Sequence, residues 1–482
     1  MIGSVMQVRA ADAYEIAHGT PSLVLMKNAA AAVLKVLQRE DLSQNKICIL
    51  AGKGNNAGDG FALAEMLSGN CKAVEIVLLA DEPFSKDAAY YFERCRACGI
   101  SIIKALPEHF DIYVDAVFGT GFSGQLPEAV AAVFARVNEL GARRVAIDLP
   151  SGMNGDSGSI SPHTFCAQET VTFQVRKLCH LLPQCAPFCG KVTVEDIGLS
   201  EQALSGIHCK ELFAPLLPEK APTLHKGSAG TLHCFVGCER YQGAATLSVS
   251  AALRSGCGMV RAFIPREIYP VLAAKISEAV LECCPQVDGG LTEAAVGIAA
   301  AQKKPNAMLI GSGLGRGTAI GEIVPALLKM NLPSVLDGDG LFFYRPHERS
   351  APLILTPHIG EFARLCDRSI TDITADRLKT CADFAMKNHC VLVLKDSVTL
   401  ITAPDGRQRL LSRPNPGLAK GGSGDVLAGM IAAFLTQSFD AFEAACTGVW
   451  YHAEAAALTA EKLGVYAMLP SDLISMLPTV LR

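Results

Sequence analysis

Short apolar runs rich in β-branched residues alternate with helical stretches along this chain, and this alternation restricts its fold more than any other feature. Such a pattern predicts βα units and a mainly parallel sheet, that is, an α/β protein. The strands expected in the first half are residues 46–51, 73–79, 112–116, 144–149, 171–175 and 191–194, with a helix opening over 61–67. Those expected in the second half are 231–236, 259–264, 307–310, 334–336, 352–355 and 391–394, then a hairpin of 398–402 and 409–411 around Asp405-Gly406.

The chain is too long for one core. Its 482 residues predict at least two domains. Between the two series of strands, a polar stretch is punctuated by Pro215, Pro218 and Pro222. Such composition is typical of a linker. We therefore expect domains over residues 1–210 and 220–482.

Composition argues against several classes of partner. A net charge of −4 gives no electrostatic basis for binding nucleic acid or a membrane surface, and one Trp with nine Tyr offers few stacking platforms. The first thirty residues carry charges throughout, so neither a targeting segment nor a membrane span is expected. A cytoplasmic protein with reduced cysteines follows. Cys95-x-x-Cys98 lacks the second ligand pair of a metal site.

Near the C-terminus, a glycine-rich segment runs from Asn415 to Asp425 and leads into the apolar run 426–435. Backbone N–H groups at a helix start, together with the helix dipole, favour an anion. Asp425 would disfavour phosphate there unless it takes a proton from a hydroxyl. The segment therefore predicts nucleotide-phosphate chemistry on an alcohol.

In the first half, polar residues follow the strands. Residues 52–60 follow the first strand, Asp115 ends the third, and Asp148 and Ser151 follow the fourth. In a doubly wound sheet these strand ends form the ligand crevice. With Asp59, three carboxylates share this edge, which suits a cation site, acid/base catalysis, or both.

An alternative is a dinucleotide fingerprint. Gly52-x-Gly54-x-x-Ala57 lies between a strand and a helix, and Asp81 falls near the place of the ribose-binding acid. Against this, Asn55, Asn56 and Asp59 put polar side chains where pyrophosphate needs bare backbone.

At these positions the chain resembles a known family. The first half resembles the NAD(P)H-hydrate epimerases, with their Gly-Lys-Gly-Asn-Asn-Gly-Gly-Asp-Gly, Asp-x-x-Phe-Gly-Thr-Gly and Asp-x-Pro-Ser-Gly patterns at residues 52–60, 115–121 and 148–152. The second half is similar to the NAD(P)H-hydrate dehydratases at residues 225–227, 243–245, 311–315, 336–339, 355–358, 395–399 and 415–425. The segments keep the family's order over nearly the whole chain. Departures from the usual residues are Lys27, Ala30, Ala57, Lys420 and Ser423.

The resemblance implies an N-terminal Rossmann-like three-layer αβα domain and a C-terminal ribokinase-like αβα domain. It also implies a multifunctional isomerase and lyase that repairs nicotinamide nucleotides. Such an enzyme interconverts the R and S hydrates of NADH and NADPH (NADHX and NADPHX) at C6. It then dehydrates the S form at the expense of ADP, forming AMP and phosphate. We expect a homo-oligomer.

For the first domain, the resemblance places a potassium ion near Asn56, Asp115 and Ser151, and makes Asp148 the group that handles the C6 proton. The substrate-binding residues that it implies are Asn55, Asn56, Ala57, Gly58, Asp59, Gly119, Thr120, Gly121, Phe122, Ser123, Gly124, Gln125 and Asp148. Without the resemblance, Asp115 and Asp148 would be interpreted as helix caps or solvated strand ends.

For the second domain, the resemblance makes Asp425 the base that deprotonates the C6 hydroxyl, with Mg²⁺ accompanying ADP as phosphoryl donor. The implied substrate contacts are Ala244, Gly313, His358 and Asp425, and the implied nucleotide contacts are Lys395, Asp396, Ser397, Val398, Thr399 and Gly424. Taken alone, His358 is typical of a helix start and Lys395 of a solvated strand end.

Two other function classes stay open at this point. A small-alcohol kinase of the ribokinase-like group would release a stable phosphorylated product. A nucleotide-sensing module would bind without turnover, although the presence of both Asp148 and Asp425 argues against it.

Overall fold

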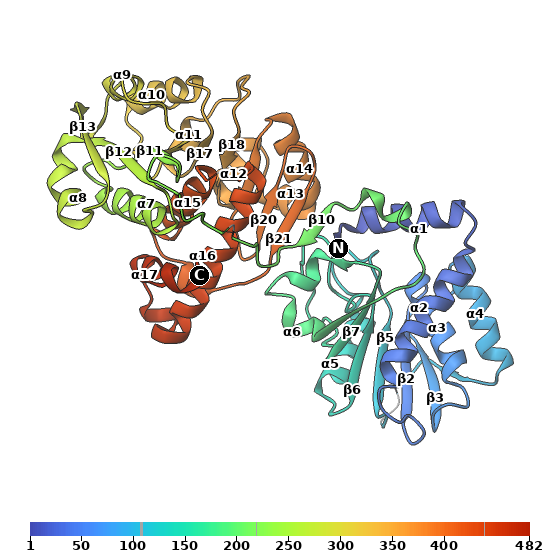
Figure 1. Cartoon of the computed structure of the whole chain (residues 1–482). Helices are drawn as coiled ribbons and strands as arrows, with labels where there is room; N and C mark the ends of the chain where they lie inside the picture. The colour runs from blue at the N-terminus through green and yellow to red at the C-terminus, as the bar shows by residue number, and fades with distance from the viewer. Residues whose placement is uncertain (107–108, 218, 438) are drawn as a thin grey trace. The chain divides into compact units, whose positions relative to one another are not determined.

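A computed structural model of the protein describes residues 1–106, 109–217, 219–437 and 439–482. The chain divides into two compact units. Figure 1 colours the chain by residue number. Unit 1 comprises Met1–Cys209 and Thr374–Arg377, and unit 2 comprises Lys210–Ile373 and Leu378–Arg482. Pro218, one of the three prolines predicted to mark the linker, lies outside the described residues.

Unit 1 is built on a seven-stranded sheet in the order β4-β3-β2-β5-β6-β7-β9. All its neighbouring strands pair in parallel, which confirms the predicted parallel sheet. The strands are β2 (Lys46–Ala51), β3 (Ala73–Leu78), β4 (Ser101–Ile103), β5 (Ile112–Ala116), β6 (Arg143–Ile147), β7 (Glu169–Phe173) and β9 (Lys191–Glu195). Of these, only the short β4 was not predicted.

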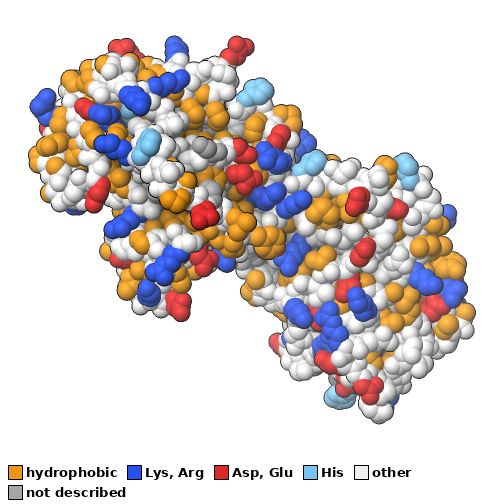
Figure 2. Space-filling model, viewed as in Figure 1, with side chains coloured by type: hydrophobic (Ala, Val, Ile, Leu, Met, Phe, Trp, Pro, Cys, Tyr) orange, Lys and Arg blue, Asp and Glu red, His pale blue; other side chains and the backbone are white. Residues whose placement is uncertain are grey.

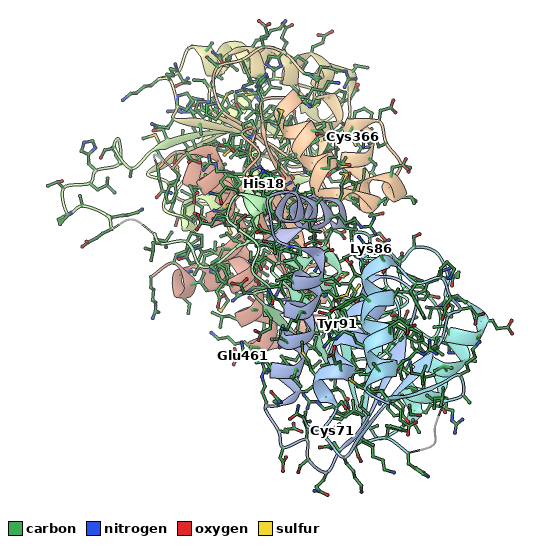
Figure 3. All side chains as sticks on the ribbon, turned by 90° about the vertical axis from the view of Figure 1, so that its right-hand side faces the viewer. His18, Cys71, Lys86, Tyr91, Cys366 and Glu461 are labelled. Atoms are coloured by element: carbon green, nitrogen blue, oxygen red, sulfur yellow. The ribbon has the colours of Figure 1, made fainter. Side chains whose placement is uncertain are left out.

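Helices cover both faces of this sheet, giving three layers. Along β2, Ile47 and Ile49 face one core while Cys48 and Leu50 face the other, as the two-residue period of a strand requires. The first core contains α2 (Ser22–Leu37), α3 (Asn55–Leu67) and α4 (Lys86–Ala97), and the second contains α5 (Glu128–Glu139). Tyr91 on α4 donates a hydrogen bond from its hydroxyl to Leu23 O at 3.3 Å (Figure 3).

Helix α3 begins at Asn55, so the prediction that it opens at Phe61 was wrong by six residues. The reason is that glycine has a low helix propensity, and residues 52–60 contain four glycines. The two glycines inside the helix are required by packing instead. An added Cβ would lie 2.5 Å from Met26 Cε at Gly58 and 2.5 Å from Ala116 Cβ at Gly60. The predicted binding loop is therefore largely the first turns of a helix.

Helix α1 (Val5–Ala17) precedes the sheet and begins with a capping box between Ser4 and Gln7. It follows β1 (Ile2–Gly3), which pairs in parallel with β8 (Arg176–Lys177) and antiparallel with β10 (Cys209–Glu211) at Cys209. The remaining elements of this unit are the 3₁₀ turns η1 (Leu178–Leu181) and η2 (Ala203–Gly206) and the short helix α6 (Ala186–Cys189). None of these was predicted.

Unit 2 contains strands in the order β13-β12-β11-β16-β17-β18-β19-β20-β21. Pairing is parallel as far as β19 and antiparallel across β20 and β21, which confirms the predicted hairpin. The strands are β11 (Thr231–Phe235), β12 (Met259–Pro265), β13 (Val280–Cys284), β16 (Ala307–Ile310), β17 (Ser334–Leu336), β18 (Leu353–Leu355), β19 (Val391–Leu394), β20 (Thr399–Thr402) and β21 (Gln408–Leu411). A separate ribbon pairs β14 (Gln286–Val287) with β15 (Gly290–Leu291).

Helices pack on both faces of this sheet as well, so unit 2 is also a three-layer αβα structure (Figure 1). On one face, α7 packs near β12, α15 near β16 and β17, and α16 near β18 to β21. The helices and 3₁₀ turns are η3 (Arg266–Ile268), α7 (Gln242–Arg254), α8 (Tyr269–Lys275), α9 (Ala294–Ala300), α10 (Thr318–Lys329), α11 (Asp339–Phe343), α12 (Ile359–Cys366), α13 (Ile370–Ala375), α14 (Arg377–Lys387), η4 (Pro416–Leu418), α15 (Ser423–Leu435), α16 (Ala441–Ala467) and α17 (Pro470–Val480).

The surface shows mixed charge. On the face drawn in Figure 2, Lys and Arg side chains are interspersed with Asp and Glu. Across the described ranges, every helix is too short or too polar to cross a bilayer.

Candidate active sites

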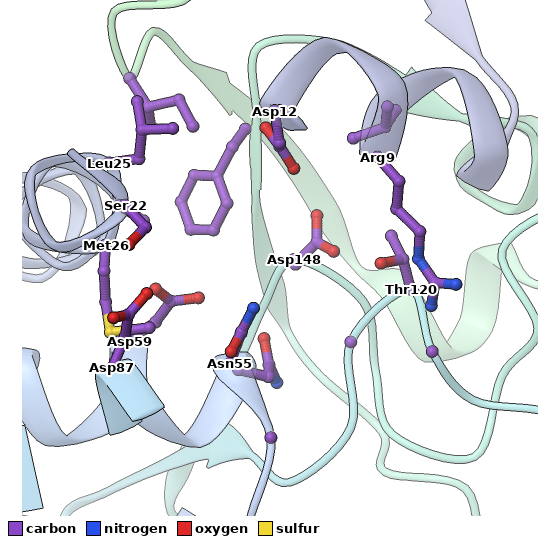
Figure 4. A pocket seen from close by; sticks show the side chains of 18 of the residues that line it. Arg9, Asp12, Ser22, Leu25, Met26, Asn55, Asp59, Asp87, Thr120 and Asp148 are labelled. Carbon is purple, nitrogen blue, oxygen red and sulfur yellow. The ribbon is translucent and has the colours of Figure 1, made fainter. Parts of the chain in front are cut away.

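In unit 1 the strand order reverses between β2 and β5, because the chain goes from β2 to β3 on one side and from β5 to β6 on the other. Ligands of open α/β sheets bind outside the carboxyl ends of the strands at such a reversal. A cavity of about 500 Å³ lies there, shown in Figure 4. Its walls come from the loops after β2, β5 and β6, from α1 and α2, and from the end of β7.

Most of the predicted substrate-binding residues line this cavity. They are Asn55, Asn56, Asp59, Gly119, Thr120, Gly121, Phe122 and Asp148. The other predicted residues, Ala57, Gly58, Ser123, Gly124 and Gln125, are not part of its wall. Ala57 is fully buried, and Gln125 Oε1 accepts a hydrogen bond from the Ser161 hydroxyl at 3.1 Å.

Asp148 forms a buried ion pair with Lys177, a residue that the sequence analysis did not select. Lys177 Nζ lies 2.5 Å from Asp148 Oδ1, and the Thr172 hydroxyl donates to the same oxygen at 3.0 Å. No residue in the described ranges donates a hydrogen bond to the second oxygen, Oδ2. Burial alone would raise the pKa of Asp148, but the charge of Lys177 and these hydrogen bonds lower it below its ordinary value. Asp148 is therefore an ionised acceptor.

His180 contacts the backbone of both members of this ion pair. Its Nδ1 accepts the Lys177 backbone N–H at 3.1 Å, so Nε2 carries the proton and donates to Asp148 O at 3.1 Å. Burial, followed by the charge of Lys177, lowers the pKa of His180 to about 3. The imidazole therefore stays neutral and holds Asp148 in its left-handed conformation, with φ of 65°.

Three more carboxyl groups line the cavity, namely those of Asp12, Asp59 and Asp87. Burial, reinforced by the charges of Asp148 and Asp12, raises the pKa of Asp59 well above its ordinary value. Burial also raises the pKa of Asp12, on α1, to about 6. The unit 1 site therefore combines one ionised carboxylate with two that hold protons more tightly.

The predicted potassium ligands lie around the loop after β5. Ser151 donates to Asp115 from its amide at 2.7 Å and from its hydroxyl at 2.6 Å. The Phe118 amide donates to Ser151 Oγ at 2.7 Å, and an added Cβ at Gly119 would lie 3.2 Å from Asn56 Oδ1. Burial, only partly offset by these hydrogen bonds, raises the pKa of Asp115 to about 7.

This arrangement fits a hard cation. A carboxylate, a hydroxyl and a side-chain amide supply oxygen donors, which such ions prefer. A nearby positive charge would also favour the ionised form of Asp115.

In unit 2 the strand order reverses between β11 and β16. Ala244 on α7 follows the first of these strands, and Gly313 follows the second. An added Cβ at Gly313 would lie only 2.7 Å from Ala244 Cβ, so these predicted substrate contacts are neighbours. Beside them a cavity of about 530 Å³ opens between Tyr241, the segment 314–320 and Asp339.

Asp425 lies in the first turn of α15, which begins at Ser423 after Gly422 in a left-handed conformation, with φ of 105°. Burial and the neighbouring charge of Asp337 raise the pKa of Asp425 to about 7, against the lowering effects of Ser312 and Lys395. A carboxylate with a pKa near neutrality suits a general base.

Lys395 is the first residue of the predicted nucleotide loop, residues 395–399, and it lies beside Asp337 and the start of α15. Its Nζ donates to Asp337 Oδ1 at 2.9 Å, and the Thr356 hydroxyl donates to the same oxygen at 2.6 Å. Burial opposes the charge on Lys395, but Asp337 raises the pKa of the ammonium group above its ordinary value. An added Cβ at Gly424 would lie 3.1 Å from Lys395 Nζ. Lys395 is therefore a paired cation beside the start of α15, and not a solvated strand end.

The other predicted residues of unit 2 differ in how exposed they are and in what they contact. His358 caps α12: its Nδ1 accepts the Gly360 amide at 3.1 Å, and its side chain is 61% exposed. A β-bridge to Lys395 nevertheless places it beside the predicted nucleotide loop. In that loop Asp396 and Ser397 are exposed, Val398 is buried, and Thr399 begins β20. Lys420, a departure from the family pattern, donates to Tyr466 O and Met468 O, each at 2.7 Å.

The comparisons with known proteins give a family. A sequence model of NAD(P)H-hydrate dehydratase matches residues 232–479, and a model described as YjeF-related protein N-terminus matches residues 22–179. The bifunctional NAD(P)H-hydrate repair enzyme Nnr of Moorella thermoacetica is 34% identical over 96% of this chain and 93% of its own length. The chain belongs to the bifunctional NAD(P)H-hydrate repair enzymes. Another relative is Nnr of Escherichia coli K12, 31% identical over 95% of this chain and 89% of its own.

A solved structure similar to part of this repair enzyme is the ADP/ATP-dependent NAD(P)H-hydrate dehydratase of Bacillus subtilis, co-crystallised with ATP and Mg²⁺. It is 31% identical with a TM-score of 0.50, and the match covers 55% of this chain and 93% of that one. The predicted fold class and family are thereby confirmed.

The family excludes the alternative of a dehydrogenase fingerprint over residues 52–57. The acid that this alternative required, Asp81, is exposed and lies 2.8 Å from Lys104. Asp81 is also absent from the wall of the unit 1 cavity.

Within the described ranges, no cluster of three or more His, Cys, Asp or Glu side chains is suited to a metal.

In this repair enzyme, sequence reasoning missed four charged residues of the unit 1 cavity that lie outside the quoted motifs: Arg9, Asp12, Asp87 and Lys177. A signal for Lys177 existed, since it follows a predicted strand at the same edge of the sheet as Asp148. Arg9 and Asp12 lie on α1, which carries no motif. Only the fold brings that helix to the cavity.

Proposed function

We propose that this chain epimerises NADHX and NADPHX at C6 in unit 1 and dehydrates the S form in unit 2, consuming ADP and forming AMP and phosphate. The observation that carries this proposal is the pair of carboxylates Asp148 and Asp425. Each lies at the carboxyl edge of its own parallel sheet, in an environment that sets its protonation state. We propose that the domains span residues 1–210 and 220–482.

In unit 1, epimerisation requires the C6 hydroxyl to leave one face of the ring and water to return to the other. Asp148 is ionised, and its Oδ2 is available to take the proton of the entering water. Asn56, Asp115 and Ser151 would hold the potassium ion, which supplies a fixed positive charge that orders the loop after β5. Residues 119–122 would contact the rest of the nucleotide.

In unit 2, dehydration is driven by making the hydroxyl a better leaving group. Asp425 takes the C6 hydroxyl proton as the oxygen attacks the terminal phosphate of ADP, and AMP leaves. The amides at the start of α15, with Lys395, hold the transferring group. The ring nitrogen then expels phosphate, and loss of a C5 proton to water gives the dihydropyridine. Mg²⁺ would supply additional charge stabilisation of the phosphates.

This function is tested with the full chain and an epimer mixture of NADHX. With ADP and Mg²⁺, we expect both epimers to be converted to NADH, seen as the near-ultraviolet absorbance of the reduced cofactor. Without nucleotide, we expect interconversion of R and S only. Accumulation of a stable phosphorylated hydrate would instead support the kinase alternative, and nucleotide binding with no turnover would support a sensor. The cytoplasmic location and the homo-oligomer stay predictions.

A further inference from the structure

We propose that Asp12 is the general acid of the epimerase site and gives its proton to the C6 hydroxyl as that group leaves. Asp148 takes a proton from the water that enters on the opposite face of the ring. This assignment rests on the proposed epimerase function of unit 1. It gives α1, which no predicted motif includes, a direct part in the reaction.

Helix α1 is held in place at both ends. The Val5 amide donates to Asp156 Oδ1 at 2.8 Å, and Gln7 Nε2 donates to Gly206 O at 2.9 Å. At the other end, Glu15 Oε2 accepts the Ser200 amide at 2.9 Å and the Ser200 hydroxyl at 2.7 Å. These contacts fix the position of the side chains that α1 presents to the cavity.

Asp12 is presented to the same space as Asp148. The residues Val8, Asp12 and Ile16, spaced four apart on α1, all line the cavity. Figure 4 shows the carboxyl groups of Asp12 and Asp148 directed into that space from different elements. Asp12 is half-buried and accepts no hydrogen bond from any residue in the described ranges. Its carboxyl group is therefore free to bind a substrate hydroxyl.

Asp148 is ionised in the resting site, so it does not carry the proton that the departing hydroxyl takes up at the start of the step. Lys177 and Thr172 both donate to its Oδ1, and these contacts favour the ionised form. The epimerisation nevertheless needs a donor for the departing oxygen as well as an acceptor for the incoming water. Two carboxyl groups held in different protonation states in one site are the usual solution to this problem.

The surroundings of Asp12 favour its protonated form. Burial raises the pKa of Asp12 to about 6, Asp148 adds to this rise, and Lys177 opposes it. Asp59 on α3 also interacts with Asp12. Arg9 is the charged neighbour on α1 itself and lies beside Thr120 at the cavity wall (Figure 4). Asp12 therefore holds its proton to higher pH than an ordinary carboxyl group does, whereas Asp148 is ionised.

The step balances in atoms and electrons. The Asp12 carboxyl proton moves to the C6 oxygen, the C6–O bond breaks, and the N1 lone pair forms the N1=C6 double bond as water leaves. A water molecule then attacks C6 from the other face, the N1=C6 π electrons return to N1, and Asp148 takes the proton from the new hydroxyl. The net result is inverted C6 and a proton moved from Asp12 to Asp148. Proton exchange with solvent then returns Asp12 to its protonated form and Asp148 to its ionised form. In the reverse reaction Asp148 donates the proton and Asp12 accepts one.

The test compares Asp12→Asn with wild-type full chain, following R and S interconversion by NMR after subtracting the uncatalysed rate. We expect a loss of about 10² to 10⁴-fold, with unchanged ADP-dependent dehydration of the S form as an internal control. In the wild type, the epimerisation rate should fall as pH rises through the pKa of Asp12, because the acid form is lost. This alkaline limb should be absent in Asp12→Asn. Asp81→Asn, which removes an exposed carboxylate outside the cavity, should behave as wild type.

Two further variants separate catalysis from a structural role. Asp12→Glu should recover part of the rate together with the alkaline limb. Asp12→Ala should be rescued by added formic acid, which can occupy the vacated space, whereas a structural loss would not respond. An Asp12→Asn protein with near wild-type epimerisation, or with an unchanged alkaline limb, would overturn the assignment. A wild-type chain that does not interconvert the epimers would overturn the epimerase function itself, and the role of Asp12 with it.

Discussion

Replacing Asp425 by Asn is expected to lower ADP-dependent dehydration by a factor of about 10² to 10⁴ while nucleotide affinity stays nearly unchanged. The reason is that Asn cannot take the C6 hydroxyl proton. Because burial and Asp337 raise the pKa of Asp425 to about 7, the wild-type rate should rise with pH through that value as the base ionises. The variant should lack this rise. The measurement is the initial rate of NADH formation from purified S-NADHX across pH, with nucleotide affinity by calorimetry.

The contrary outcome is informative because Asn caps a helix about as well as Asp does. If Asp425 only capped α15, turnover of Asp425→Asn would stay near wild type, and the kinase-like mechanism would have to be abandoned. Asp367→Asn is a matched control in the same unit. Asp367 is exposed at the end of α12 in a left-handed conformation, which Asn also tolerates.

Replacing Asp148 by Asn is expected to abolish interconversion of R and S while ADP-dependent dehydration of the S form continues. The variant leaves the Lys177 ammonium buried without its carboxylate, since only 1% of that side chain is exposed. Breaking a buried pair in this way destabilises a protein by about 3–5 kcal/mol, so unit 1 should also unfold at lower denaturant concentration. NMR of the epimers and a two-probe denaturation curve measure the two effects.

The double variant Asp148→Asn with Lys177→Met separates these effects. Removing both charges should restore much of the lost stability, because no unpaired ion is left in the interior. Epimerisation should stay absent, because the proton acceptor is still missing. Recovery of epimerisation in the double variant would show that Asp148 contributes only to folding.

The sheets were predictable because buried parallel strands are nearly continuous apolar runs, as in residues 47–51 and 391–394. The edge strand Ser101–Ile103 escaped this criterion because its residues are exposed or only partly buried, so it forms no buried apolar run. The start of α3 escaped it for a different reason. The low helix propensity of glycine argues against a helix at Gly58 and Gly60. The helix forms there nevertheless, and glycine is needed because Met26 and Ala116 leave no room for a side chain.

The candidate sites were predictable where a residue follows a strand. Asp115 and Asp148 could be placed this way because the carboxyl ends of parallel strands share one edge. Asp12 could not, because nothing in a helical sequence states which sheet edge the helix will cover. The Lys395–Asp337 pair required the order of β17, β18 and β19, which sequence alone does not give.

We infer that one chain carries two independent sites, one that interconverts the R and S epimers and one that dehydrates the S form. This inference is tested most directly by supplying purified R-NADHX with ADP and Mg²⁺ to the Asp148→Asn and Asp425→Asn variants, separately and mixed, and measuring NADH formed above the uncatalysed rate. Asp148→Asn alone should form NADH only as fast as R converts spontaneously to S, and Asp425→Asn alone should form almost none. The mixture should restore enzymatic conversion, because the S form released by one variant is the substrate of the other. A mixture no faster than Asp148→Asn alone would contradict the claim.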